Sequence, residues 1–297
     1  MLDLSQLSTE QRNERTQDLD LMSPLEALKA MNQEDAQVAP AVGKAIPQIE
    51  KAVEAVIRAF KSGGRLIYVG AGTSGRLGFL DAAECPPTFG TPPEQVVALL
   101  AGGTVAFAQA VEGAEDDYAM GAKDLQDIGL EARDVVIGIA ASGRTPYVLG
   151  ALEYAREVGC TTASISCNEN SPISSVADIP IEVIVGPEVL TGSTRLKAGT
   201  AQKLVLNMIS TVSMVGIGKV FKNLMVDVQP TNKKLETRAV NIIMSATGCT
   251  QEKAVQHLKL AEGSVKLAIV MILLNCDVHT ARAKLDAADG HIRKSII

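Results

Sequence analysis

Apolar and polar positions alternate along the chain in two recurring patterns. Five short stretches are nearly continuously apolar, which is typical of strands buried on both faces of a sheet; they cover residues 65–70, 96–100, 134–140, 162–167 and 181–185. Helical patterns lie between them, over residues 74–83, 116–128 and 146–157, with a short turn near 171–176. This alternation predicts an α/β fold with a doubly wound, five-stranded parallel sheet.

The segment before the first strand predicts an arm and two helices. Residues 1–20 are polar and are expected to form an extended arm. Ser23 followed by Pro24 is typical of a helix start, and this helix should run to about Met31. A longer helical pattern covers residues 35–61, and Pro40 and Pro47 are expected to break or kink its first half.

The segment after the last strand changes character. Residues 197–219 predict a long apolar helix that closes the α/β domain. From residue 235 onward no strand pattern occurs, and helical patterns cover 250–260, 264–274 and 278–288. We therefore expect three segments: an N-terminal arm with helices (1–54), an α/β domain (55–219) and a small helical region (220–297).

Composition limits the function classes. Hydrophobic residues make up 46% of the 297 residues and aromatic residues only 3%, so the core must be aliphatic. The net charge is −6 and no run of Lys and Arg occurs, which argues against a nucleic-acid partner. The longest apolar run, residues 267–274, is too short for a membrane span, which needs about 20 residues. We expect a cytoplasmic protein without a membrane partner.

Cysteine usage agrees with that location. The five cysteines are an odd number, and no two of them are spaced as C-x-x-C. This pattern argues against a disulfide framework and against a zinc site. We expect reduced thiols and no bound metal.

Three turns rich in glycine and hydroxyl groups predict an anion site. They cover residues 70–76, 141–145 and 191–197. Glycine lets the backbone approach a ligand, a helix N-terminus offers N–H groups, and hydroxyls add donors. The candidate ligand-binding residues in these turns are Gly72, Thr73, Ser74, Ser142, Gly143, Thr145, Ser193, Thr194 and Lys197.

Nucleotide binding fits these turns less well. None of the three turns ends in the Gly-Lys-Ser/Thr of a P-loop. Gly70, Gly72 and Gly75 match G-x-G-x-x-G, but the acidic Glu94 lies before the second strand instead of at its end. Dinucleotide binding is therefore the weaker interpretation.

The acid–base candidates are carboxylates. Glu84 lies between an apolar helix and Pro86-Pro87, an unusual place for a solvated side chain. Glu115 lies in an acidic cluster that could equally be a helix N-terminus favoured by the dipole. The three histidines all fall in the helical region, where surface or packing roles are the commoner ones.

Two long motifs resemble one family. Residues 64–90, GRLIYVGAGTSGRLGFLDAAECPPTFG, and residues 191–203, TGSTRLKAGTAQK, are similar to the N-acetylmuramic acid 6-phosphate etherases, and the resemblance extends over the whole chain. It implies a sugar isomerase (SIS) domain, a role in cell-wall sugar recycling, and cleavage of the lactyl ether with water to N-acetylglucosamine 6-phosphate and D-lactate. It implies no metal and no organic cofactor.

The resemblance also implies roles for single residues. Glu84 matches the family's catalytic acid and Glu115 its second acid–base group. Hydroxyls that hold phosphate in SIS domains match Ser74, Ser142 and Thr145. Ala140 departs from the pattern, because many sugar isomerase domains carry a hydroxyl there.

Spacing bears on the number of subunits. Ser74 and Glu84 are ten residues apart, which is about 15 Å along a continuous helix and longer than the span from the phosphate to carbon 3 of the sugar. Either the helix breaks near Gly78 and the chain folds back, or Glu84 serves the site of a second subunit. We favour a homodimer with a shared site that takes a sugar-phosphate substrate.

Three other functions would use a similar sugar-phosphate site. An aldose–ketose isomerase would use the same phosphate site and a carboxylate base. A non-catalytic sugar-phosphate regulator similar to the glucokinase regulatory protein would have two SIS domains, and this chain has room for one. A transcriptional regulator of the RpiR type would need a helix-turn-helix and a basic face, and the acidic segment before Ser62 argues against it.

Overall fold

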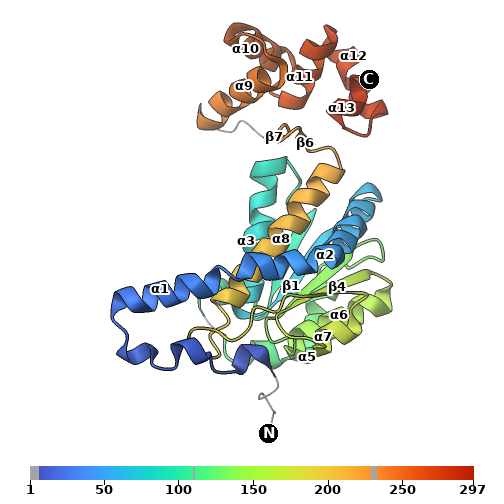
Figure 1. Cartoon of the computed structure of the whole chain (residues 1–297). Helices are drawn as coiled ribbons and strands as arrows, with labels where there is room; N and C mark the ends of the chain where they lie inside the picture. Colours follow the sequence, from blue (N-terminus) through green and yellow to red (C-terminus); the bar gives the residue numbers. More distant parts are fainter. Residues whose placement is uncertain (1–6, 110, 229–232) are drawn as a thin grey trace. The chain divides into compact units, whose positions relative to one another are not determined.

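The computed structural model describes residues 7–109, 111–228 and 233–297. The chain divides into two compact units (Figure 1). The first, here called the α/β unit, comprises residues 1–82 and 94–210; the second, the helical unit, comprises residues 83–93 and 211–297. This division differs from the three segments expected from the sequence, because a piece of the chain around residue 88 belongs with the C-terminal helices.

The centre of the α/β unit is a five-stranded sheet. Its strands are β1 (Leu66–Gly70), β2 (Val96–Leu100), β3 (Val135–Ile139), β4 (Thr161–Ser166) and β5 (Ile179–Glu182). They are all parallel, in the order β2-β1-β3-β4-β5. All residues of β1 and β3 are buried, as their continuous apolar sequence predicts. The predicted fold class is confirmed.

Strand β5 lies earlier than predicted. We expected residues 181–185, and the strand is Ile179–Glu182 with Pro180 inside it. Proline lacks an N–H to donate and is tolerated at the edge of a sheet, which is where β5 lies. The prediction therefore missed the first two residues of the strand and continued past its end.

Helices cover both faces of the sheet. Figure 1 shows α5 (Tyr118–Asp127), α6 (Pro146–Val158) and α7 (Pro172–Val176) on one side, and α2 (Val38–Lys61) with α8 (Lys197–Gly216) on the other. Ile67 and Val69 of β1 pack with Leu152 of α6. Tyr68, between them, points to the opposite face and donates a hydrogen bond to Asp81 of α3 (Gly72–Phe89). Successive residues of a strand face opposite sides, so one strand serves both layers.

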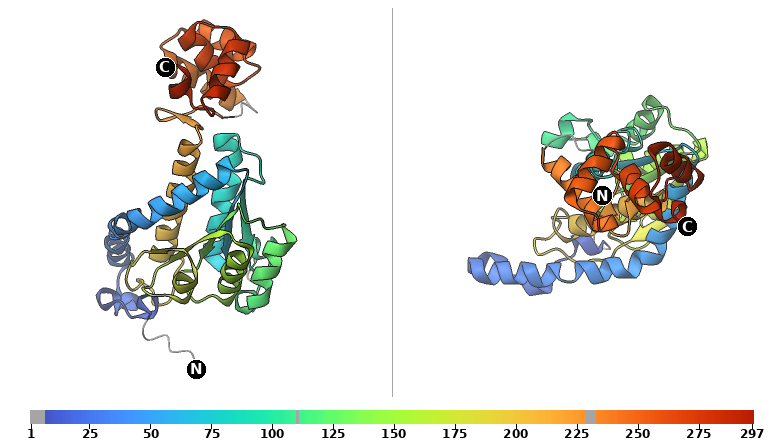
Figure 2. Two further views of the ribbon diagram at one scale, coloured as in Figure 1. Left: turned by 90° about the vertical axis from the view of Figure 1, so that its right-hand side faces the viewer. Right: turned by 90° about the horizontal axis from the view of Figure 1, so that it is seen from above.

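The N-terminal helices differ from the prediction in length: α1 ends later, and α2 starts later. Helix α1 (Pro24–Asp35) starts at Ser23, whose side chain forms a capping box with Glu26. Helix α2 runs without a break through Pro47, so of the two predicted effects the break is wrong, and the kink stays a prediction. Pro40 lies in the first turn of α2, where the missing N–H costs little. Figure 2 shows α1 extending away from the sheet.

The predicted extended arm is also corrected. Residues 7–22 form three 3₁₀ turns: η1 (Ser8–Glu10), η2 (Glu14–Thr16) and η3 (Leu19–Leu21). Asn13 Nδ2 donates to Pro187 O over 3.2 Å and Thr16 Oγ1 to Val189 O over 2.9 Å. Ser8 Oγ donates to Asn168 Oδ1 at 3.0 Å. These bonds hold the arm on the chain that follows β4 and β5. Residues 1–6 of the predicted arm lie outside the described residues.

Helix α3 is unbroken. It runs from Gly72 to Phe89 and includes Pro86 and Pro87 near its end. The option in which the helix breaks near Gly78 is therefore wrong. Gly78 packs against the Tyr68 ring and Ile139, where a Cβ would approach Tyr68 Cβ to 3.0 Å.

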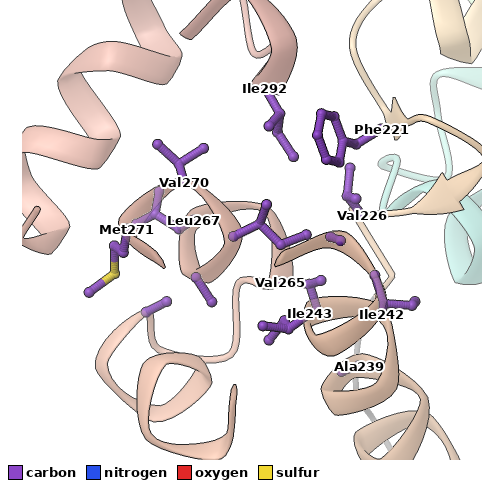
Figure 3. Close-up of a cluster of buried hydrophobic side chains, with 14 of the residues drawn as sticks. Phe221, Val226, Ala239, Ile242, Ile243, Val265, Leu267, Val270, Met271 and Ile292 are labelled. Carbon is purple, nitrogen blue, oxygen red and sulfur yellow. The ribbon is translucent and has the colours of Figure 1, made fainter. Parts of the chain in front are cut away.

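The helical unit has its own aliphatic core. It contains a hairpin of β6 (Val220–Phe221) and β7 (Leu224–Met225), and the helices α9 (Lys233–Thr247), α10 (Gln251–Leu260), α11 (Val265–Leu274), α12 (Val278–Ala287) and α13 (Ile292–Ser295). Phe221, Ile243, Val270 and Ile292 meet in its centre (Figure 3). Three of the helices were predicted; α9, α13 and the hairpin were not. None of the helices, among the residues described, is long and apolar enough to span a membrane.

Candidate functional site

The carboxyl edge of the sheet between β1 and β3 is where the candidate residues gather. Strand order reverses here, because β2 lies on one side of β1 and β3 to β5 lie on the other. Gly70 and Ile139 end the two strands opposite each other. Ligands of doubly wound sheets bind at such a switch point. The first two predicted turns therefore leave the sheet side by side.

Glycines make the first turn tight. A Cβ on Gly70 would lie 2.7 Å from the N of Gly75, and one on Gly75 would lie 2.5 Å from Gly70 O. Gly72 has a left-handed backbone, with φ of 54°. The chain can thus turn from β1 directly into α3, with Thr73 half-buried and Ser74 buried in its first turn.

Ser74 is bonded to a residue that was not singled out from the sequence. Its Oγ donates to Gln202 Oε1 of α8 over 2.9 Å. Gln202 is 1% exposed, and its Nε2 has no hydrogen-bond partner among the described residues. Leaving a buried donor unpaired costs about 1–3 kcal/mol. Gln202 lies inside the 191–203 motif, which was the available signal, but helix periodicity cannot show which neighbour it faces.

The second turn carries Ser142, Gly143 and Thr145. Ser142 Oγ accepts a bond from Arg144 N over 3.3 Å. Gly143 has φ of 71°, and a Cβ there would lie 2.2 Å from Ser171 Cβ, so only glycine fits. Thr145 precedes α6, and its hydroxyl forms no capping bond to that helix. Ser142 and Thr145 are half-buried, so their hydroxyls remain reachable.

The third turn approaches the first. Ser193 and Thr194 are half-buried, and Thr194 O accepts a bond from Gly199 N over 3.0 Å. A Cβ on Gly199 would lie 3.5 Å from Thr73 Cγ2. The start of α8 therefore packs beside the start of α3, and the structure brings these two predicted turns together.

The N-terminus of α8 already holds a carboxylate. Glu188 accepts hydrogen bonds from Lys197 N at 3.0 Å and from Ala198 N at 2.9 Å. Burial raises the pKa of the Glu188 carboxyl, although these two bonds oppose the shift. The N–H groups at this helix start are thus engaged by the protein itself.

The ammonium of Lys197 is engaged as well. Lys197 and Glu34 are each 2% exposed, and Lys197 Nζ lies 2.6 Å from Glu34 Oε2. Arg15 forms a second ion pair with Glu34. Burial alone would raise the pKa of Glu34, but Lys197 and Arg15 outweigh it and lower the pKa. This network joins the N-terminal arm and α1 to α8, and sequence periodicity does not reveal it.

Glu115 lines a cavity next to the first turn. It lies in the 3₁₀ turn η4 (Ala114–Asp116), directly after Gly113, whose φ is 75°. The cavity has a volume of about 340 Å³ and is also lined by Gly72 and Arg76. Arg76 donates to the carbonyls of Phe107 and Ala106, which holds the loop around α4 (Val105–Ala108) over this cavity. An exposed carboxylate thus lies beside the turn that carries Thr73 and Ser74.

Glu84 is exposed on α3, one turn beyond a buried network. Asp81 accepts bonds from Tyr68 Oη, from Asn207 Nδ2 at 2.7 Å and from Ser210 Oγ at 3.0 Å. These bonds fix the rotation of α3 about its axis where it leaves the α/β unit. Glu84 itself belongs to the helical unit, whereas Glu115 belongs to the α/β unit.

Comparisons with known proteins agree on a family and a fold. Residues 48–156 match the family model of the glucokinase regulatory protein N-terminal SIS domain, and residues 105–212 match that of the SIS domain. N-acetylmuramic acid 6-phosphate etherase 2 of Lactiplantibacillus plantarum is 60% identical over 99% of this chain and 100% of its own. The N-acetylmuramic acid 6-phosphate etherase of a Geobacillus strain is 60% identical over 99% of both chains.

A solved structure supports the fold alone. A phosphoheptose isomerase from Francisella tularensis superposes with a TM-score of 0.51 at 18% identity, over 65% of this chain and 100% of that one. The match is similar in length to the α/β unit.

Proposed function

This chain belongs to the N-acetylmuramic acid 6-phosphate etherase family, and we propose that it cleaves the D-lactyl ether of N-acetylmuramic acid 6-phosphate with water. The products are N-acetylglucosamine 6-phosphate and D-lactate, which makes the reaction that of a carbon–oxygen lyase. The observation that carries this proposal is 60% identity over 99% of the chain to etherases of that name.

The bond broken suggests elimination followed by hydration. An ether at carbon 3 of a sugar resists hydrolysis at neutral pH. When the ring opens to the aldehyde, the carbon 2 proton lies next to a carbonyl and a base can remove it. The electrons then form a carbon 2–carbon 3 double bond as the carbon 3–oxygen bond breaks. Water adds to carbon 3 of the unsaturated aldehyde, and carbon 2 is protonated again.

We assign the two proton transfers to Glu115 and Glu84. Glu115 takes the carbon 2 proton and returns it after hydration; its position in the cavity beside Gly72 supports this role. Glu84 protonates the departing lactyl oxygen and, once deprotonated, activates the water. Each general acid or base contributes about 10²–10⁴-fold to such a rate.

The phosphate would be held by the three turns. We propose Gly72, Thr73 and Ser74 together with Ser142, Gly143, Thr145, Ser193 and Thr194 as the ligand-binding residues. Because the ammonium of Lys197 pairs with Glu34, backbone N–H groups are better donors to the enolate oxygen than Lys197. Lys197 would then shape the site by fixing the start of α8.

Isotope exchange separates the two carboxylates. In Glu84→Gln we expect D-lactate release to fall about 10²–10⁴-fold, while exchange of the carbon 2 proton with deuterated water continues. In Glu115→Gln both should be lost. Glu157→Gln, an exposed glutamate of α6, is the matched control and should behave as the unchanged enzyme. Exchange that survives in Glu115→Gln but not in Glu84→Gln would reverse the two roles.

We infer that the active unit is a homodimer with shared sites. Helix α3 is unbroken between Ser74 and Glu84, so about 15 Å of helix separates them, more than the phosphate-to-carbon-3 span of one sugar. An exposed apolar stripe of Leu21, Leu25 and Leu28, with exposed fractions of 79%, 61% and 64%, also supports a subunit contact.

Mixing variants tests this arrangement. Glu84→Gln chains and Ser74→Ala chains, each much less active alone than the unchanged enzyme, should regain part of the activity when they are unfolded together and refolded. A heterodimer with shared sites contains one intact site. A mixture that is no more active than its two parent variants, with heterodimers demonstrated by mass spectrometry, contradicts shared sites.

One assay distinguishes the etherase from the related functions. An aldose–ketose isomerase or a non-catalytic regulator would bind the sugar phosphate without releasing D-lactate, which is measured with D-lactate dehydrogenase. We also infer a cytoplasmic location, which the five free cysteines support.

A further inference from the structure

The buried pair of Ser74 and Gln202 contains a hydrogen-bond donor that the pair itself does not satisfy. The only proton of the Ser74 hydroxyl goes to Gln202 Oε1 over 2.9 Å. The amide group of Gln202 is buried with the rest of its side chain, and its Nε2 donor has no partner among the described residues. Buried polar groups of native proteins are almost always paired, so this donor points to a second state of the pair.

The hydroxyl cannot serve two acceptors at once. A serine hydroxyl has one proton and two lone pairs. If Ser74 donates that proton to a phosphate oxygen, as the proposed function requires, it gives up its bond to Gln202 Oε1. It then has a free lone pair facing Gln202. A turn of the amide about its last side-chain bond brings Nε2–H to this lone pair.

We propose that Gln202 is the positioning residue of the phosphate site, which switches from accepting a hydrogen bond from Ser74 to donating one to it when the sugar phosphate binds. This inference rests on the proposed phosphate contact of Ser74. A carboxamide suits the role because it carries both an acceptor and a donor on one rotatable group. A donated bond also polarises the hydroxyl and strengthens its own bond to the anion.

The neighbourhood of the pair agrees with this role. Ser74 lies in the first turn of α3, a helix of 18 residues whose N-terminus favours anions. At the start of α8, by contrast, the N–H groups of Lys197 and Ala198 are bonded to Glu188. Gln202 thus links the helix start that can bind phosphate to the helix start that is already occupied.

Two substitutions of Gln202 separate the switch from simple packing. In Gln202→Glu the ionised carboxylate can accept from Ser74 but cannot donate, so it keeps the serine proton away from the phosphate and repels the dianion. We expect KM for N-acetylmuramic acid 6-phosphate to rise roughly 30- to 100-fold at pH 8.5, with kcat changed far less. The control is Gln126→Glu, at an exposed position of α5. The ratio of KM for Gln202→Glu to KM for this control should fall as the pH decreases, because a protonated carboxyl at position 202 can donate a hydrogen bond to Ser74.

Gln202→Met has similar volume and no hydrogen-bonding group. We expect KM to rise about 10-fold, without the pH dependence of Gln202→Glu. In the double variant Ser74→Ala/Gln202→Met, KM should equal that of Ser74→Ala alone, because Gln202 acts only through Ser74. Three results would each overturn the proposal: an additive rise of KM in the double variant, an unchanged KM in both single variants of Gln202, or a decrease of kcat without a rise of KM.

A second probe keeps this test separate from the etherase activity. Inorganic phosphate should raise the melting temperature of the unchanged protein and of Gln126→Glu at pH 8.5, but not that of Gln202→Glu. If D-lactate is not released yet phosphate stabilises in this selective way, the etherase assignment fails and the inference about Gln202 stands. Equal stabilisation of all three proteins overturns the inference whatever the activity.

Discussion

Buried polar side chains are divided unevenly between the two units. The α/β unit buries ionisable groups, including Glu34, Lys197, Asp134 and Glu188. In the helical unit the only polar side chains found buried among the described residues are Thr91, Ser213 and Ser295, and none of them is charged. The buried aromatic rings among the described residues of this unit are those of Phe89 and Phe221, and the cluster around Phe221 is otherwise apolar and non-aromatic.

The α/β unit buries charged groups at a cost in stability that the helical unit avoids. Burying a charge is costly unless it is paired, and an apolar replacement of the pair is often equally stable. Much of this buried charge in the α/β unit lies around the start of α8, next to the turns that we propose as the ligand site. In the helical unit Glu84, the proposed acid, is exposed, and the core is apolar. The two units should therefore respond to substitution in different ways.

The largest effect is expected from Lys197→Met. Removing the ammonium leaves Glu34 buried with Arg15 and Asn13 as its remaining partners, and breaking a buried pair costs about 3–5 kcal/mol. Hydrogen exchange read by mass spectrometry should show the loss of protection in the α/β unit. The double variant Glu34→Gln/Lys197→Met should regain part of this free energy. A double variant no more stable than the single one would mean that packing, and not the unpaired charge, caused the loss.

A smaller loss, without a charge component, is expected from Leu267→Ala in the helical unit. Leu267 is 6% exposed, and removing a buried leucine side chain costs about 2–5 kcal/mol. Leu260→Ala, at a position 53% exposed, is the matched control and should change the free energy of unfolding by less than about 0.5 kcal/mol. Equal losses would show that the helical unit does not depend on the core in Figure 3.

The smallest of the three effects is expected from Asp134→Asn, and it should depend on pH. Arg65 NH2 lies 2.6 Å from Asp134 Oδ2. Burial alone would raise the pKa of Asp134, but the bonds from Arg65 and from the backbone N–H of Glu131 lower it. Such a lowered pKa contributes stability above the unfolded value of about 3.9. That contribution is lost as the pH falls through the folded pKa.

Urea unfolding at pH 7 and pH 3 measures this contribution. The free energy of unfolding of the unchanged protein should exceed that of Asp134→Asn by about 1.5–3 kcal/mol at pH 7. This difference should be smaller at pH 3. The control Asp127→Asn removes an exposed pair with Lys123, and we expect it to cost no more than about 0.5 kcal/mol. A gap for Asp134→Asn that is the same at both pH values would contradict the assigned charge effect.

Local patterns predicted the sheet and most helices because those patterns coincide with burial. The strands β1 and β3 are buried on both faces and read as apolar runs. The hairpin of β6 and β7 was not predicted, because each of its strands has only two residues. Its turn also lacks the glycine that marks such turns and uses Lys222 at a φ of 56°. The three turns of the candidate site were visible as glycines and hydroxyls.

Partners of the site residues were not visible in the same way. Ser74 meets Gln202 across 128 residues of sequence, and Lys197 meets Glu34 across 163. Such pairs follow from how α1, α3 and α8 pack against one another, which no local periodicity encodes. Lys197, a predicted ligand-binding residue, has its ammonium in a buried ion pair with Glu34.

The N-terminal arm has a consequence for folding. Ser8 bonds to Asn168 and Thr16 to Val189, at separations of 160 and 173 residues. Closing loops of this length is slow, because the chain loses conformational entropy before the stabilising contacts form. During synthesis the arm leaves the ribosome before its docking surface, which is made only after more than 150 further residues. The arm is therefore translated long before the surface on which it docks, and it reaches its native place after that surface has formed.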